Sequence, residues 1–123
     1  MAWYATPDDT YNFTVSAFLE GSLQIWNATL TAESVTYDLV KLGVDYAPTL
    51  SIHPGATVSV SVYGKNVGTA TDNFMVRLIV AGVAADCPSF QLTVGSVDPT
   101  PRIFTFTMPS SNTACKIETF HEQ

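Results

Sequence analysis

Two cysteines carry the most distinctive chemistry in this chain. Cys87 and Cys115 flank the last strand-like runs of the sequence. Neither belongs to a Cys-x-x-Cys motif or has a histidine at metal-ligand spacing. They are suited either to a disulfide, which stabilises a fold by about 3–4 kcal/mol on the chain-entropy account, or to packing as small unpaired core residues. We predict a Cys87–Cys115 disulfide that ties the start of one late strand to the final one.

The histidines and acids are poorly placed for catalysis or metal binding. His53 precedes Pro54 in a turn, and His121 lies in the C-terminal tail. Neither has a cysteine or carboxylate neighbour at the spacing of a metal ligand. Asp8 and Asp9 fit a solvated turn, and no Gly-x-Ser-x-Gly nucleophile motif occurs. We therefore expect no catalytic residues, no metal ligands and no cofactor, and we expect that the chain is not an enzyme.

Aromatic residues near the N-terminus are the best candidates for binding. Trp3 and Tyr4 lie outside any alternating run, and large exposed aromatics often anchor protein interfaces. We predict that both contact a protein partner, with residues 1–9 docking against another subunit or partner surface. Acceptor sequons begin at Asn12 and Asn27, and the sequence leaves their glycosylation open.

Short runs with a period of two must position these residues. Val58, Val60 and Val62 alternate with Thr and Ser in the cleanest run, as in a half-buried strand. The apolar phase slips by one residue at Trp26, as it does at a β-bulge. The predicted strands are 11–19, 23–30, 34–40, 47–52, 56–63, 73–80, 90–94, 102–108 and 113–120. The predicted core consists of Val58, Val60, Val62, Phe74, Val76, Leu78 and Phe106.

This pattern indicates an all-β protein. The chain has 123 residues, of which 46% are hydrophobic and 13% charged, as suits one folded domain rather than a disordered segment. Short strands separated by turns predict an immunoglobulin-like antiparallel β-sandwich of 7–9 strands. Residues 1–45 are expected to form an N-terminal hairpin extension packed on a sandwich of residues 46–123, the two making one compact unit.

Residues 46–120 resemble the CARDB family, the cell-adhesion-related domain of bacteria and archaea. The similarity lies in the Pro-Gly turn and Val-rich strand of residues 54–62, the Asn-x-Gly loop of residues 65–70, and the apolar strand of residues 74–82. Residues 1–45 lie outside it. The resemblance implies an extracellular interaction or spacer module with no catalytic residues to carry over.

Charge and hydropathy exclude several partners. The net charge is −6, from eleven acidic and five basic residues, which argues against nucleic acid and anionic lipid. The longest apolar run, near residues 74–83, is interrupted by Arg77 and is too short to insert in a membrane. The N-terminus lacks the basic and apolar regions of a signal peptide, so we expect either a mature fragment or a complete protein.

We expect a non-catalytic structural or interaction module that makes protein–protein contacts in an extracellular or particle assembly. It would be a cell-surface adhesin-type domain or a small virion structural or decoration protein. Its partner would be another protein or further subunits of the assembly, a homo-oligomer included, and its location would be the cell surface or the virion surface. The alternative is a carbohydrate-binding module, which needs an exposed planar row of aromatic residues.

Overall fold

The computed structural model describes residues 6–10, 12, 21–46 and 50–122, and these contain nine β-strands and no helix. The strands are β1 (Leu23–Ala32), β2 (Val35–Lys41), β3 (Val44–Asp45), β4 (Thr57–Asn66), β5 (Asp72–Val80), β6 (Val83–Asp86), β7 (Phe90–Leu92), β8 (Arg102–Thr107) and β9 (Cys115–His121). They form two antiparallel sheets. The predicted all-β sandwich of 7–9 strands is therefore confirmed.

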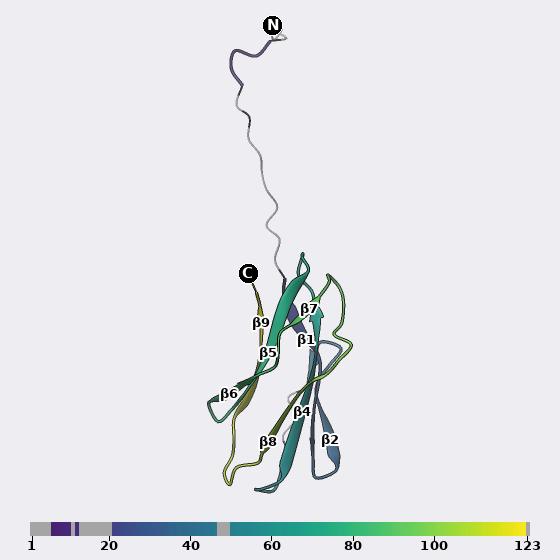
Figure 1. The fold of residues 1–123 in the computed structure, drawn as a ribbon, viewed down its shortest axis with the longest axis vertical. Coiled ribbons are helices and arrows are strands. Elements are labelled where there is room, and N and C mark those ends of the chain that lie inside the picture. The colour runs from purple at the N-terminus through teal and green to yellow at the C-terminus, as the bar shows by residue number, and fades with distance from the viewer. Residues whose placement is uncertain (1–5, 11, 13–20, 47–49, 123) are drawn as a thin grey trace.

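The two sheets differ in width. Sheet A has five strands in the order β3-β2-β1-β4-β8 (Figure 1). Sheet B is built on β5, which pairs with β9 over residues 74–80 and with β6 over residues 77–80. Because a strand has only two edges, β9 occupies one edge of β5, while β6 and then β7 share the other. Sheet B is therefore only three strands wide.

The chain passes between the sheets in a way that fits the immunoglobulin pattern. It goes from β4 in sheet A to β5, β6 and β7 in sheet B, returns to β8 in sheet A, and ends on β9 in sheet B. The β4–β8 and β5–β9 pairs correspond to the pairing of strand B with E and of strand C with F in immunoglobulin domains. Strand β1 pairs with β4 from Leu23 to Ala32, so the β1–β2 hairpin is continuous with sheet A.

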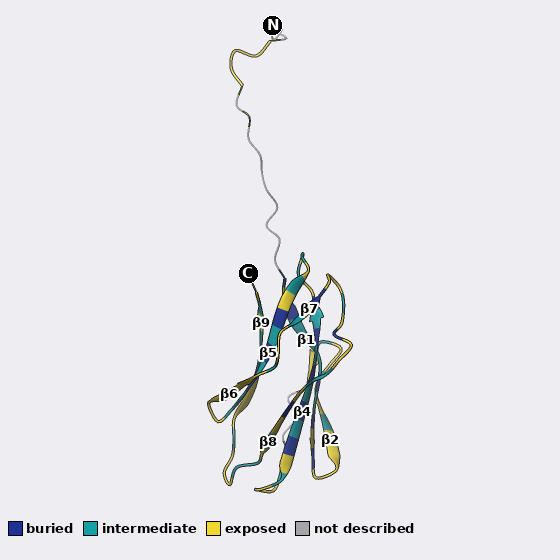
Figure 2. Ribbon diagram, in the orientation of Figure 1, coloured by how far each residue is buried: buried dark blue, intermediate teal, exposed yellow. Residues whose placement is uncertain are grey.

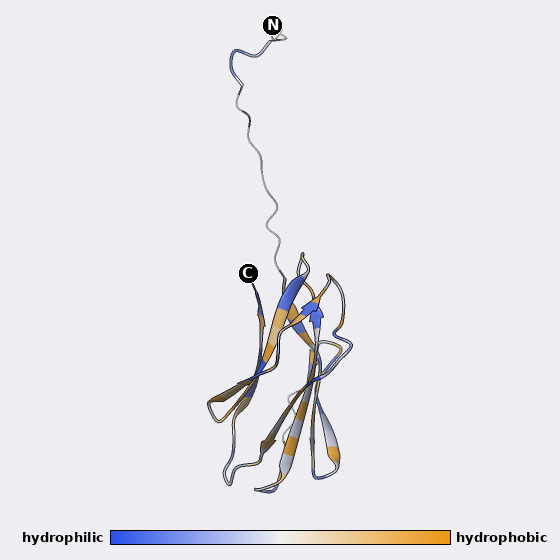
Figure 3. Cartoon of the chain, viewed as in Figure 1, coloured by the Kyte–Doolittle hydropathy of each residue, from blue (hydrophilic) through white to orange (hydrophobic). Residues whose placement is uncertain are grey.

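Alternation along β4 and β5 creates the core. Buried and half-buried residues alternate along β4, and so do hydrophobic and polar ones (Figures 2 and 3). All the predicted core residues are buried except Phe106, which is half-buried, and Phe104 takes its place as the buried aromatic of β8. Phe106 also faces inward, opposite Val58, but it lies nearer the end of β8, where two surface hollows reach it.

The β-bulge predicted at Trp26 is confirmed. The β1–β4 register shifts between Ile25, which pairs with Gly64, and Asn27, which pairs with Tyr63. Trp26 is the extra residue. A Cβ atom added to Gly64 would lie 2.6 Å from Leu23 Cδ1, so the absence of a side chain at Gly64 is what lets Leu23 pack across it.

Three hairpins and one segment differ from the sequence-based prediction. In each hairpin a two-residue turn has both residues at positive φ, the geometry of a type I′ turn. These turns are Glu33-Ser34, Leu42-Gly43 and Ala81-Gly82. The last two create β3 and β6, which the sequence did not predict. The strand predicted over 47–52 is wrong at residues 50–52, where Leu50 and Ile52 pack against the core outside any strand; residues 47–49 lie outside the described part.

Candidate interaction surface

The predicted disulfide is absent from the structure, where Cys87 and Cys115 are both free thiols. Cys115 pairs with Val80 on one edge of β5. Cys87 lies beside Val76 on the opposite edge, donating its N–H to the Val76 carbonyl at 3.0 Å and accepting the Val76 N–H at Sγ at 3.2 Å. Four residues of strand span about 13 Å, whereas a disulfide needs Cα atoms within about 7 Å. The prediction was wrong because the cysteines flank opposite sides of one strand.

The two thiols should differ in reactivity. Cys115 is exposed and Cys87 half-buried, so we expect a maleimide to modify Cys115 first. Partial burial raises the pKa of the Cys115 thiol, so the reactive thiolate should be scarcer at neutral pH than in a free cysteine. The alkylation rate should therefore rise with pH up to a higher midpoint than that of a cysteine peptide, as followed by intact mass. An untreated sample that gains two hydrogens on reduction would contradict the free-thiol state.

Other predicted contact residues are only partly within the described structure. Trp3 and Tyr4 lie outside it, so their predicted partner contact stays a prediction. Asn12 is exposed. Asn27 is half-buried on β1, and its Oδ1 accepts the Leu42 N–H at 2.8 Å, so this side chain already has a structural role in the β2–β3 turn.

Two of the ion pairs among the described residues shift the pKa of a carboxylate. Glu33 Oε1 accepts hydrogen bonds from the backbone N–H and Nδ1 of His53, both at 2.8 Å, and these bonds lower the pKa of Glu33. Arg77 holds the pKa of the Asp86 carboxylate below its usual value by hydrogen bonding. Within residues 6–10, 12, 21–46 and 50–122, no three His, Cys, Asp or Glu side chains are grouped to hold a metal ion. The same residues contain no helix long and apolar enough to cross a membrane.

Three of the described aromatic rings have one face covered by a cation. The ring centroids lie 4.4 Å from the Lys65 ammonium for Trp26, 4.8 Å from the Arg77 guanidinium for Phe120 and 4.0 Å from the Arg102 guanidinium for Phe90. Sugar stacking needs a free, flat aromatic face, and these three rings each have one face occupied. The carbohydrate-binding alternative therefore gains no support from them.

The unequal widths of the sheets open a groove along one side of the sandwich. Sheet A continues through β2 and β3 beyond the line where sheet B stops at β9, so the inner face of β2 lies opposite no described strand. The resulting β2–β9 groove has a volume of about 460 Å³. It is lined by Ile25, Leu30, Leu39, Val40, Asp45, Leu50, Val60, Leu78, Thr113, Cys115, Lys116 and Ile117. Three of these residues, Leu30, Val60 and Leu78, belong to the buried core, so the groove reaches down to the core.

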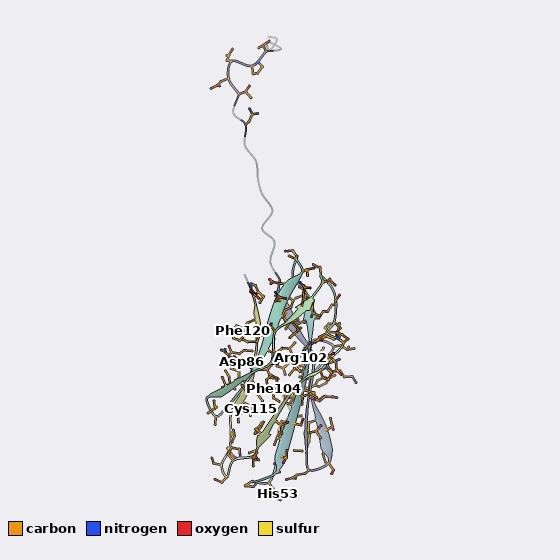
Figure 4. The ribbon with its side chains drawn as sticks, in the orientation of Figure 1. His53, Asp86, Arg102, Phe104, Cys115 and Phe120 are labelled. Carbon is orange, nitrogen blue, oxygen red and sulfur yellow. The ribbon has the colours of Figure 1, made fainter. Side chains whose placement is uncertain are left out.

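The β2–β9 groove is mainly apolar and extends further along the sandwich. Its charged lining residues, Asp45 and Lys116, have opposite signs. A second hollow of about 390 Å³ adjoins it, and the two share the lining residues Leu30, Leu50, Thr113 and Cys115. Cys115 lies on β9 (Figure 4) and lines the groove, so a reagent that reacts with this thiol labels the groove.

The opposite side of the sandwich has a groove of its own. This β6–β8 groove of about 470 Å³ lies between the outer strands of the two sheets. Its lining includes Val83 and Ile103, which are 72% and 60% exposed. Its lining side chains carry no charge. The sandwich therefore presents apolar residues in a groove on each of its two sides.

The fold and its grooves define the chain as a β-sandwich protein with an open apolar groove beside an edge strand. No protein-family model, curated protein or solved structure matches it, so the CARDB resemblance stays an expectation. Leu39 and Ile117 were not singled out from the sequence, because the alternating pattern identifies the inner face of a strand without showing whether another strand covers it.

Proposed function

We propose that the chain is a non-catalytic structural or interaction module of an extracellular or particle assembly, where it makes protein–protein contacts. The observation that supports this proposal is the β2–β9 groove, which is lined by the half-buried Leu39 and Ile117 and reaches down to the buried core residue Val60. When a partner covers such a groove, removing the apolar area from water stabilises the complex by about 25 cal/mol for each Å². The assembly would lie on a cell surface or a virion surface.

Cys115 offers a direct test of the proposal. In a Cys87→Ser variant, a bulky maleimide can be attached to Cys115 alone, at the wall of the β2–β9 groove. We expect the unmodified protein to bind a protein partner, itself included, and the modified protein to lose at least about 90% of that binding, because the adduct occupies the groove. Sedimentation velocity and photo-crosslinking with an extract of its source would measure both states.

The matched control carries the same adduct on the outer face of sheet A. Thr31 lies there on β1 as an exposed residue, opposite Thr36 and Ser59. None of the three lines either groove, so a Thr31→Cys variant without the native cysteines directs the maleimide away from both. This adduct should leave binding unchanged. A protein that forms no protein contact in either assay but is retained on insoluble polysaccharide would replace our proposal with the carbohydrate-binding alternative.

A further inference from the structure

We propose that residues 11–19 of one copy of the chain add as a β-strand to the free edge of β9 in a second copy and fill its β2–β9 groove. This inference rests on the proposed function and specifies its partner: the same chain. Strand addition to an open sheet edge is an established mode of protein recognition, in which backbone hydrogen bonds give affinity and alternate side chains enter pockets.

The acceptor is the edge of β9 that faces away from β5, where backbone N–H and C=O groups can bind an added strand. Directly after β9, the Glu122 N–H donates to the Asn73 carbonyl, and directly before β9 the Ala114 carbonyl accepts from the Ala81 N–H. Because the direction of hydrogen bonding alternates along a strand, the even-numbered residues of β9 face β5. Cys115, Ile117 and Thr119 then direct their N–H and C=O groups to the other edge, with which no described strand pairs.

The unequal widths of the two sheets favour strand addition at β9 rather than at β8. Both strands have an edge with no described neighbour. A strand added beside β8 would widen sheet A, which already has five strands. A strand added beside β9 would widen sheet B and cover the inner face of β2, including Leu39 and Val40 of the groove. Only the second addition completes the two-layer core.

The donor segment, residues 11–19, suits the β9 edge and the groove in its apolar pattern, its lack of charge and its length. Tyr11, Phe13, Val15, Ala17 and Leu19 alternate with Asn and Ser/Thr up to residue 16, and the segment contains no charged residue and no proline. Such a strand would direct one apolar row into a groove. Nine extended residues span about 30 Å, enough to run the length of β9, which has seven.

Described residues on either side of the donor favour a second copy over the same chain. Gly21 is buried against Asp72, where an added Cβ atom would clash with the Cβ atom of Asp72, so the position of Gly21 is fixed by packing. Residues 6–10 are all exposed, and Figure 1 shows them well beyond that end of the sandwich. Residues 6–10 thus lie away from the groove of their own chain.

Two pairs of full-length variants test the donor and the acceptor. Val15→Asp places a charge on the apolar row of the donor, whereas Ser16→Asp places it on the other row. Thr119→Pro removes an N–H from the free edge of β9, whereas Thr119→Val keeps it; both lose the hydroxyl that donates to the Leu23 carbonyl at 2.8 Å. We expect Val15→Asp and Thr119→Pro to weaken self-association by about 100-fold or more, and Ser16→Asp and Thr119→Val to associate like wild type. Analytical ultracentrifugation gives the association constants, and circular dichroism verifies that each variant is folded.

A crosslinking experiment covers the case in which Thr119→Pro fails to fold. In a Cys87→Ser background, a Val15→Cys variant is mixed from ¹⁴N and ¹⁵N preparations and treated with a bismaleimide. Links from the introduced thiol at position 15 to Cys115 that join one light and one heavy chain support the proposal. Links only within one chain overturn it, because the segment then covers its own groove.

Other outcomes separate this inference from the proposed function. Wild type that stays monomeric up to about 100 μM overturns the inference, while binding to a different protein that the Cys115 adduct blocks leaves the proposed function standing. Self-association that Thr105→Pro on β8 abolishes and Thr119→Pro does not would move the contact to the other edge, and would also overturn the inference.

Discussion

Replacing Val60 with aspartate should leave the chain unfolded at 25 °C. Val60 is 2% exposed on β4, between Leu30 of β1 and Phe104 of β8 in the register of sheet A. No described basic residue pairs with either neighbour, so the new carboxylate would be buried without a counter-ion. An unpaired buried charge costs several kcal/mol, and a domain of this size has about 5–15 kcal/mol of stability in total. Far-ultraviolet circular dichroism and urea titration would show the loss.

The neighbouring position supplies the control for Val60→Asp. Ser59 precedes Val60 on the same strand, but its side chain lies on the outer, half-buried face of sheet A, opposite Thr31 and Thr105. Ser59→Asp brings the same charge to the same strand and should lower stability by about 1 kcal/mol or less. If both variants melted like wild type, the assignment of inner and outer faces on β4 would be wrong.

Regular alternation was the part of the fold that the sequence could predict. A strand with one buried face must alternate, since successive side chains point to opposite faces, and β4 follows this rule from Thr57 to Asn66. The bulge could be predicted for the same reason, because one extra residue at Trp26 reverses the phase. Asn66 could be assigned to a loop motif but not to its full role: it is buried, with Nδ2 donating to the Ala70 and Leu92 carbonyls and Oδ1 accepting the Gly68 N–H.

Features that depend on pairing between distant strands could not be predicted. The Glu33-Ser34 turn lacks the Asn-Gly or Asp-Gly signature of a type I′ hairpin, yet both residues have positive φ, 53° and 65°. Register between the strands imposes this conformation, and sequence patterns do not show it. The groove has the same origin, because the width of each sheet is set by which strands pair. The prediction of a Cys87–Cys115 disulfide failed for the same reason, because the local sequence around each cysteine gives no sign that β5 lies between them.

A buried ion pair fixes the segment that leads into β8. Asp98 is 2% exposed, and its carboxylate accepts two hydrogen bonds from Arg102, at 2.7 Å from Nε and 3.0 Å from Nη2. It also accepts the Thr100 N–H at 3.1 Å. The guanidinium of Arg102 in turn lies 4.0 Å from the ring centroid of Phe90 on β7. Arg102 of sheet A thus contacts sheet B through the Phe90 ring, and Asp98 holds the guanidinium in that position.

A second pair of the same chemistry lies on the surface and provides a matched comparison. Arg77 and Asp86 join β5 to β6 through two hydrogen bonds, at 2.6 and 3.2 Å. The Asp86 side chain is 42% exposed, whereas that of Asp98 is 1% exposed. Figure 4 labels one residue of each pair, Asp86 and Arg102. The two pairs therefore differ mainly in burial.

Asp98→Ala should destabilise the protein by about 3 kcal/mol or more, because it leaves Arg102 largely buried without its counter-ion and the Thr100 N–H without an acceptor. Asp86→Ala should change the urea midpoint little, since water can replace the lost hydrogen bonds at an exposed site. Adding Arg102→Leu to Asp98→Ala should recover part of the lost stability, because the unpaired charge is then removed as well. Urea titrations of the four proteins, wild type included, would measure these differences. Equal effects of Asp98→Ala and Asp86→Ala would show that burial does not set the strength of the Asp98–Arg102 pair. The segment before β8 would then have to be held by its backbone contacts, such as the Asp98 N–H that donates to the Gly64 carbonyl at 2.8 Å.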